Sequence, residues 1–179
     1  MNTNDFTAYE AQVRTRAKNW IPKNMRELAR VDPSAAKNLM ADLFTDLFFQ
    51  EQPTETVMED VEELVPELQS AIGIRTDERF AVVFLDQGRR ILGQKVYDGG
   101  SRTRTVLYPR QLFKDALKLD ATGIVLAHNH PGGSLTPSAP DRDLTRKVEQ
   151  IGESLEITLV DHLIVTATGH AFFRRNGWL

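Results

Sequence analysis

Apolar residues in the first third of the chain recur at the spacing of one helix face. Between residues 35 and 48 they follow i, i+4, i+5, i+8, i+9, i+12 and i+13: Ala35, Leu39, Met40, Leu43, Phe44, Leu47 and Phe48. That spacing predicts an amphipathic helix, and Asp32-Pro33-Ser34 supplies its cap and first turn. A second helix is predicted over residues 56–72, where Pro66 kinks or divides it.

From residue 80 the pattern changes to short apolar runs separated by turns. Continuous apolar runs predict buried strands over residues 80–86 and 122–128, and residues 90–97 predict a strand that forms a hairpin with the first. Helices are predicted over 110–119 and from the N-cap Ser138 to about Leu155. The domain is completed by one or two strands in residues 157–167, a turn at 168–170 and a final segment over 171–175. The alternation predicts an α/β fold in which helices flank a mixed β-sheet.

The change of pattern predicts two parts, a helical N-terminal extension over residues 1–53 and an α/β domain over residues 54–179. Charge is unevenly spread: residues 1–31 carry six basic and three acidic side chains, and residues 51–70 carry seven acids and no Lys or Arg. The simplest interpretation of both stretches is a solvated helix face. The alternative is that the basic arm contacts nucleic acid or an acidic partner.

Composition excludes several classes of site and location. The chain has no cysteine, which excludes disulfide scaffolds, thiolate metal sites and cysteine nucleophiles. Its net charge of −3 gives no general attraction to nucleic acid. The apolar runs are far shorter than the roughly 20 residues of a membrane span, and the first residues do not resemble a signal peptide. We therefore expect a soluble, cytoplasmic protein without a membrane partner.

The strand predicted over residues 122–128 ends in a pair of histidines. His128 and His130 stand at i and i+2, so their side chains point to one face. Asp141 follows after ten intervening residues, in the first turn of the next helix, where a carboxylate is favoured. Two imidazoles, one carboxylate and a water form the open tetrahedral zinc site of a hydrolase, and Zn²⁺ lowers the pKa of such a water toward about 7. Alternatively, the histidines bond to loop carbonyls and Asp141 caps the helix.

A zinc hydrolase also needs a proton acceptor for the attacking water. Glu78 stands immediately before the strand predicted over residues 80–86 and is the candidate base. Its neighbour Asp77 is the competing candidate.

These residues resemble a known motif. His128-Asn129-His130-Pro131 with Ser138-Ala139-Pro140-Asp141 resembles the JAMM motif of metalloproteases, His-x-His-Pro with a later Ser-x-x-Asp. More narrowly, the chain resembles the RadC family from about residue 54 to residue 179. The segments that carry this resemblance are Ala127-His128-Asn129-His130-Pro131-Gly132-Gly133, Thr136-Pro137-Ser138 and Asp161-His162-Leu163-Ile164-Val165.

The resemblance implies a JAMM/MPN domain of cytidine-deaminase-like fold, without the Pro-Cys-x-x-Cys that a deaminase needs. It implies that His128, His130 and Asp141 hold zinc and that Glu78 activates the water. It also implies that Ser138 steadies the oxyanion, a role that general electrostatics supports. The chain departs from the family pattern in three places, which bear on substrate preference rather than on the metal site: the segment Tyr108-Pro109-Arg110-Gln111, the residue Ser134, and about the first 50 residues, which do not resemble the helix-hairpin-helix module of many RadC proteins.

The function implied is a zinc metallohydrolase that cleaves a peptide or isopeptide bond in a protein or peptide substrate. One alternative is a DNA-repair or DNA-processing role on phosphodiester bonds, and another is a non-catalytic interaction module that keeps the metal. Asp161 and His162 also match the family. Because adjacent strand residues face opposite ways, only one of them can face the site, either as a loop anchor or as a partner of a metal ligand.

Overall fold

The computed structural model describes residues 28–48, 56–97 and 107–179. The chain divides into two compact units, Met1–Lys37 and Asn38–Leu179. The predicted helix around residues 35–48 is confirmed as α3 (Pro33–Phe48), and Asp32 caps it by accepting a hydrogen bond from the Ala35 N–H at 2.9 Å. Most of the basic arm lies outside the described residues.

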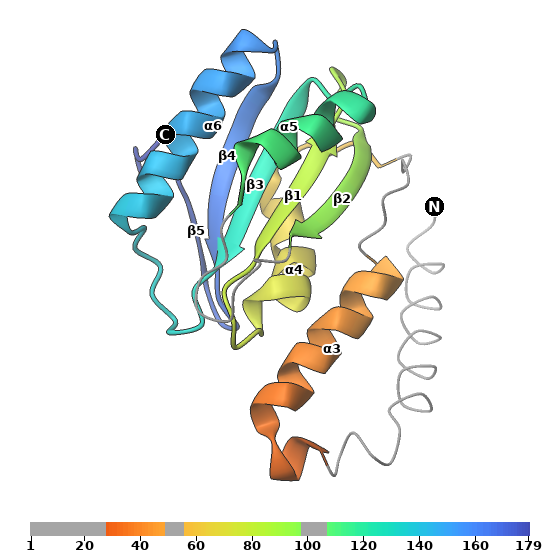
Figure 1. Cartoon of the computed structure of the whole chain (residues 1–179), viewed down its shortest axis with the longest axis vertical. Helices are drawn as coiled ribbons and strands as arrows, with labels where there is room; N and C mark the ends of the chain where they lie inside the picture. Colours follow the sequence, from red (N-terminus) through yellow and green to blue (C-terminus); the bar gives the residue numbers. More distant parts are fainter. Residues whose placement is uncertain (1–27, 49–55, 98–106) are drawn as a thin grey trace. The chain divides into compact units, whose positions relative to one another are not determined.

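The predicted mixed sheet is confirmed (Figure 1). Five strands lie in the order β2-β1-β3-β4-β5, and their bounds are β1 (Phe80–Leu85), β2 (Ile91–Tyr97), β3 (Gly123–Asn129), β4 (Thr158–Val165) and β5 (His170–Phe172). Only the β3–β4 pair is parallel among these strands. The 157–167 segment forms one strand, and His170 begins β5 opposite Val165 instead of lying in the preceding turn.

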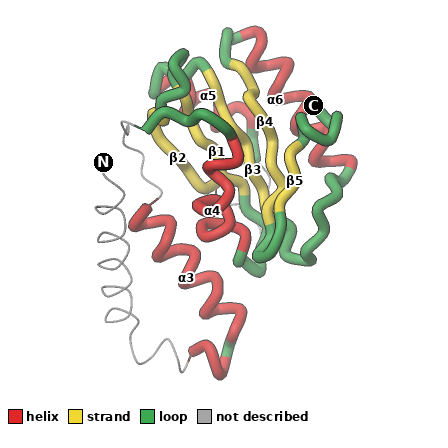
Figure 2. The backbone as a smooth tube through the Cα atoms, turned by 180° about the vertical axis from the view of Figure 1, so that it is seen from behind, coloured by secondary structure: helices red, strands yellow, loops and turns green. Residues whose placement is uncertain are grey.

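Helices cover both faces of the sheet, which Figure 2 shows from behind. One face carries α5 (Pro109–Lys118) and α6 (Ala139–Ser154), which agree closely with the predicted helices. Their core cluster includes Leu112, Phe113 and Val148, packed with Phe80 and other side chains of the sheet. This face therefore holds the even-numbered side chains of β1 and β3, the series that ends in His128.

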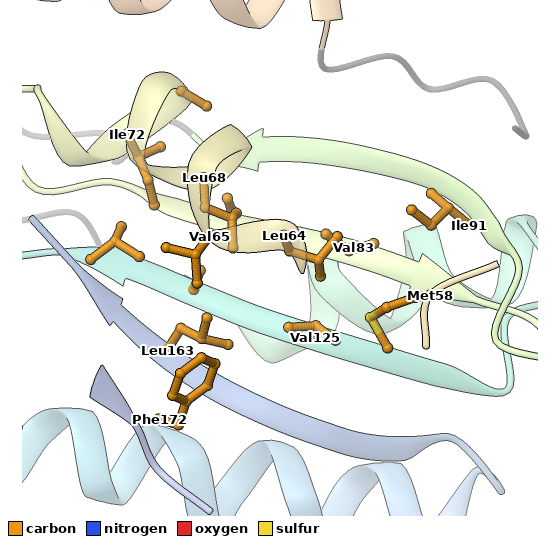
Figure 3. Close-up of a cluster of buried hydrophobic side chains, with 14 of the residues drawn as sticks. Met58, Leu64, Val65, Leu68, Ile72, Val83, Ile91, Val125, Leu163 and Phe172 are labelled. Carbon is orange, nitrogen blue, oxygen red and sulfur yellow. The ribbon is translucent and has the colours of Figure 1, made fainter. Parts of the chain in front are cut away.

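The other face carries three short helical turns, η1 (Val61–Leu64), α4 (Val65–Leu68) and η2 (Gln69–Gly73), which follow one another without a break. They bury Leu68 and Ile72 against side chains such as Val83 and Val125 (Figure 3). This burial closes the second core, and the sheet is consequently covered by apolar side chains on both sides.

The helix predicted over residues 56–72 is wrong in its first five residues. Val57 forms an antiparallel bridge with Arg90, and Asp60 caps η1 by accepting from Glu62 N–H at 2.8 Å. The division near Pro66 is confirmed: this residue lies in the first turn of α4, where its missing N–H costs nothing.

Strand register gathers the candidate residues at one end of the sheet. Phe80 at the start of β1 lies opposite His128 near the end of β3, so the Glu78 segment enters beside the histidine pair. On the other side of β3, Leu126 lies opposite His162 of β4. In the part of the chain that the structure describes, no helix is long and apolar enough to cross a bilayer.

Candidate metal centre

Three potential ligand atoms from the predicted set converge on one point. His128 Nε2 lies 3.0 Å from His130 Nε2, and Asp141 Oδ2 lies 3.6 Å from the first nitrogen and 3.5 Å from the second. A tetrahedral zinc ion with bonds of about 2.0–2.1 Å separates its ligands by about 3.3 Å. The three distances bracket that value, so the donors fit one small tetrahedral cation.

The donors come from two elements that the fold fixes independently. His128 belongs to β3 and is fully buried, whereas His130 stands just beyond the strand and exposes 17% of its side chain. The His130 N–H still donates to the Val165 carbonyl of β4 at 3.3 Å, which holds the loop entrance to the sheet. Asp141 lies in the first turn of α6. His130 is thus the most exposed of the three donor residues.

The loop after His130 orients its ring. Gly133 donates to the His130 carbonyl at 2.9 Å and adopts a φ of 78°, a left-handed conformation that glycine takes without strain. The next carbonyl, that of Ser134, lies 2.8 Å from His130 Nδ1. Because a carbonyl only accepts, His130 Nδ1 carries the proton and its Nε2 is left for the cation.

Ser138 holds the Asp141 carboxylate through a capping box. Its N–H and hydroxyl donate to Asp141 Oδ2 at 2.7 and 2.6 Å, and the Asp141 N–H donates back to Ser138 Oγ at 3.3 Å. The predicted N-cap is therefore confirmed. The oxygen that accepts from the cap, Asp141 Oδ2, is also the one that faces the two histidines, so Ser138 fixes the position of the atom that would bind a metal ion.

The surroundings of Asp141 within the centre favour its ionised form. Burial disfavours the ionised Asp141, but the adjacent imidazoles of His128 and His130 and the hydrogen bond from Ser138 outweigh it and hold the pKa of Asp141 far below its ordinary value. The neighbouring Asp141 carboxylate raises the pKa of His130 against the effect of burial, and the Ser134 carbonyl raises it further. Two ring nitrogens 3.0 Å apart beside a carboxylate oxygen need a proton or a metal ion among them.

Glu78 and Asp77 have different surroundings. The charge of Glu78 contributes to the raised pKa of His130, which places Glu78 within electrostatic reach of the centre. Asp77 instead accepts from Arg75 Nε at 2.9 Å and from Arg79 at 2.6 Å. Burial disfavours its charge, but these two arginines lower the pKa of Asp77 below its ordinary value. Asp77 is therefore committed to ion pairs.

Asp161 and His162 divide their roles as the alternation of a strand requires. The Asp161 carboxylate accepts from the Arg174 N–H at 3.0 Å and from the His162 N–H at 2.7 Å, which anchors the C-terminal turn. His162 faces the centre, and its Nε2 lies 2.8 Å from His128 Nδ1. Complete burial and the neighbouring His128 lower the pKa of His162 well below its ordinary value.

Two residues near the centre were missed in the sequence. Thr145 lies 2.7 Å from His162 Nδ1 through its hydroxyl; its place four residues after Asp141, on the same helix face, was an available signal. Asn129 is fully buried and bonds to the segment around Glu78. The signal there was a polar residue in an apolar strand, on the face opposite to the one that His128 occupies.

Comparison with known proteins identifies the family. A family model described as a RadC-like JAB domain matches residues 56–178. Similar curated proteins are a UPF0758 protein of Thermosynechococcus vestitus, 36% identical over 146 residues (80% of this chain, 58% of the relative), and one of Synechocystis sp., 33% identical over 160 residues (88% and 66%). A third, from Burkholderia cenocepacia, is 39% identical over 112 residues (63% and 44%).

The chain thus spans 44–66% of the length of these three relatives. The match covers the whole sheet and the residues of the candidate metal centre. The chain belongs to the RadC family, and residues 56–178 are its RadC-like JAB domain.

Proposed function

We propose that this chain is a zinc-dependent hydrolase that cleaves a peptide or isopeptide bond. The observation that carries the proposal is the spacing of three donor atoms, 3.0, 3.5 and 3.6 Å apart, one of them on a histidine whose side chain is 17% exposed. Two imidazoles and one carboxylate are the protein ligands of many catalytic zinc sites, which keep a fourth position open. Membership of a JAB-domain family supports a hydrolase.

Zinc held by His128, His130 and Asp141 would supply a polarised substrate carbonyl and a water of lowered pKa. Neighbouring groups already orient two of these residues for metal binding. The Ser134 carbonyl keeps His130 Nε2 free of a proton, and the Ser138 N–H keeps the Asp141 carboxylate in place.

The proposed reaction needs one group that moves a proton. Glu78 accepts a proton from the attacking water and returns it to the amine nitrogen as the C–N bond breaks. Its influence on the pKa of His130 supports this role. Asp77 is a poor base because two arginines stabilise its carboxylate and lower its pKa.

Ser138 is proposed to donate a hydrogen bond from its hydroxyl to the oxyanion that develops on the substrate carbonyl. The hydroxyl now donates to Asp141 Oδ2 at 2.6 Å. It can turn toward substrate without releasing the ligand, because the Ser138 N–H donates to the same oxygen at 2.7 Å. The Ser138 N–H would therefore hold Asp141 while the Ser138 hydroxyl binds the oxyanion.

Ligand number favours carbonyl chemistry over phosphodiester cleavage. Within the described ranges, His128, His130 and Asp141 are the one group of three or more histidine or acidic residues close enough to share an ion. Nucleases and phosphatases commonly use two metal ions about 3.5–4 Å apart to hold the attacking and leaving oxygens. A single three-ligand centre with one carboxylate base suits addition of water to an amide carbonyl.

The test compares substrates on the same zinc-loaded preparation. Labelled linear and isopeptide-linked ubiquitin-like fusions are incubated beside labelled single- and double-stranded DNA, with Glu78→Gln as the matched control. We expect cleavage of a peptide or isopeptide bond that a chelator and Glu78→Gln both abolish. Zinc-dependent cleavage of DNA alone would replace this proposal with the phosphodiester alternative, and cleavage of neither would favour an interaction module.

A further inference from the structure

We propose that Thr145 and His162 form a positioning pair that fixes the ring proton of His128 on Nδ1 and so directs His128 Nε2 to the metal. The inference rests on the metal centre of the proposed function, and it is independent of the substrate and of the bond cleaved. The pair belongs to α6 and β4, whereas His128 belongs to β3.

The argument starts at the Thr145 hydroxyl, which makes two short contacts. Its Oγ1 lies 2.7 Å from the carbonyl oxygen of Asp141 and 2.7 Å from His162 Nδ1. A carbonyl oxygen cannot donate, so the single hydroxyl proton of Thr145 lies on the first contact. The second contact then needs its proton from the ring, and His162 Nδ1–H donates to Thr145.

The position of the proton on His162 determines the position of the proton on His128. Its ring is fully buried and stacks on Phe173 with centroids 4.3 Å apart, surroundings that disfavour a second, charge-giving proton. With its one proton on Nδ1, His162 Nε2 is an acceptor. His128 Nδ1, 2.8 Å away, must therefore donate to it. In the neutral His128 ring the lone pair is then on Nε2, the atom that faces His130 and Asp141.

The bridge joins two ligands of the same centre. It begins at the backbone carbonyl of Asp141 and ends at the ring of His128, with links of 2.7, 2.7 and 2.8 Å. The opposite polarity would put a proton on Nε2 of His162 and leave the ring proton of His128 on its own Nε2, where it would block the ligand atom. The orientation of the Thr145 hydroxyl thus determines whether His128 Nε2 is free to bind a metal ion.

The experiment compares Thr145→Val, which keeps the shape and removes the hydroxyl, with Thr145→Ser, which restores the hydroxyl. Zinc affinity is measured for the full chain by competition with a chromophoric chelator. We expect Thr145→Val to bind zinc about 10–100-fold more weakly, the usual effect of removing a group that orients a metal-binding histidine. Thr145→Ser should bind close to the wild-type affinity, which a loss of packing alone would not explain.

The ring protons are read directly by long-range ¹H–¹⁵N NMR of the wild-type chain without zinc, because bound zinc would itself exclude a proton from His128 Nε2; the chain has four histidines. The inference expects protons on Nδ1 of both His128 and His162, and this measurement decides the matter even if Thr145→Val does not fold. A proton on Nε2 of His162, or wild-type zinc affinity in folded Thr145→Val, would overturn the inference alone. A wild-type chain that binds no zinc would overturn the proposed function as well.

Discussion

The backbone N–H of Arg79 donates to the side-chain oxygen of Asn129 at 2.6 Å. The amide nitrogen of Asn129 donates in turn to the Asp77 carbonyl at 3.0 Å, so one buried side chain holds the backbone on both sides of Glu78. Asn129 lies between the two proposed histidine ligands in the sequence. It therefore ties the segment that carries the proposed base to the strand that carries the proposed ligands.

Replacing Asn129 by leucine should lower stability and activity while sparing the metal ligands. The change leaves the Arg79 N–H and the Asp77 carbonyl without this partner, so we expect the free energy of unfolding to fall by about 1–3 kcal/mol. Urea denaturation measures it. The control is Asn176→Leu, since Asn176 is exposed and donates to the Phe172 carbonyl at 2.7 Å. Equal losses in the two variants would contradict the special role of Asn129.

Glu78→Gln should separate catalysis from metal binding. The glutamine keeps the shape of the side chain but accepts no proton, so turnover should fall by about a hundredfold or more while zinc content stays near normal. Steady-state kinetics with elemental analysis measure both quantities on the substrate that the assay identifies.

Asp77→Asn is the matched control for that variant. It should weaken the ion pairs with Arg75 and Arg79, and thereby stability, while turnover per folded molecule is retained. An active Glu78→Gln beside an inactive Asp77→Asn would move the role of base to Asp77. Loss of zinc in Glu78→Gln would make Glu78 a ligand instead.

Most of the fold could be predicted because its elements follow local patterns. Continuous apolar runs predicted β1 and β3, and the Ser138 cap predicted the start of α6. The segment at residues 56–60 could not be predicted, because its pairing with the residues around Arg90 is a contact between distant parts of the chain. Apolar spacing alone also does not distinguish the 3₁₀, α and π turns of residues 61–73.

For the candidate centre, spacing and motif identified the side chains that converge, but not those that orient them. His128, His130 and Asp141 stand close together in the sequence, and the structure brings their ligand atoms together. The contact between Thr145 and His162 depends on how α6 packs against β4. The hydrogen bonds between Asn129 and the segment around Glu78 depend on the β1–β3 register, which cannot be deduced from the sequence.

Asp115 should make stability depend on acid pH. Burial disfavours its charge, but hydrogen bonds from Gln111, Lys95 and Tyr97 hold the pKa of Asp115 below its ordinary value of 3.8. A depressed pKa in the folded state stabilises the protein above pH 3.8, and the contribution is lost as pH falls through the folded pKa. Asp115→Asn should therefore cost about 1.5–3 kcal/mol near pH 7 and less at lower pH.

The measurement is urea denaturation of wild type and Asp115→Asn at several pH values. Asp143→Asn is the control, because the exposed pair of Asp143 with Arg146 should contribute little to stability. A stability difference for Asp115→Asn that does not shrink below pH 3.8 would contradict the expected linkage.

The predicted boundary at residue 54 can be tested by truncation. A chain that begins at Thr54 should fold and keep its zinc, because the proposed ligands and both sheet cores lie beyond that point. It loses Asp42, which pairs with Arg75, and Asn38, which accepts from the Thr76 N–H at 3.0 Å. A chain that begins at Asn38 is the control. If only the longer chain is soluble, α3 belongs to the folded core and the boundary is wrong.

The zinc content of the purified chain tests the central claim most directly. Elemental analysis should find one zinc ion per wild-type chain and none in the double variant His128→Ala, His130→Ala, which removes both imidazole ligands. Circular dichroism of the same samples should show that the variant keeps its secondary structure. Zinc bound to the folded double variant in the wild-type amount would contradict the account.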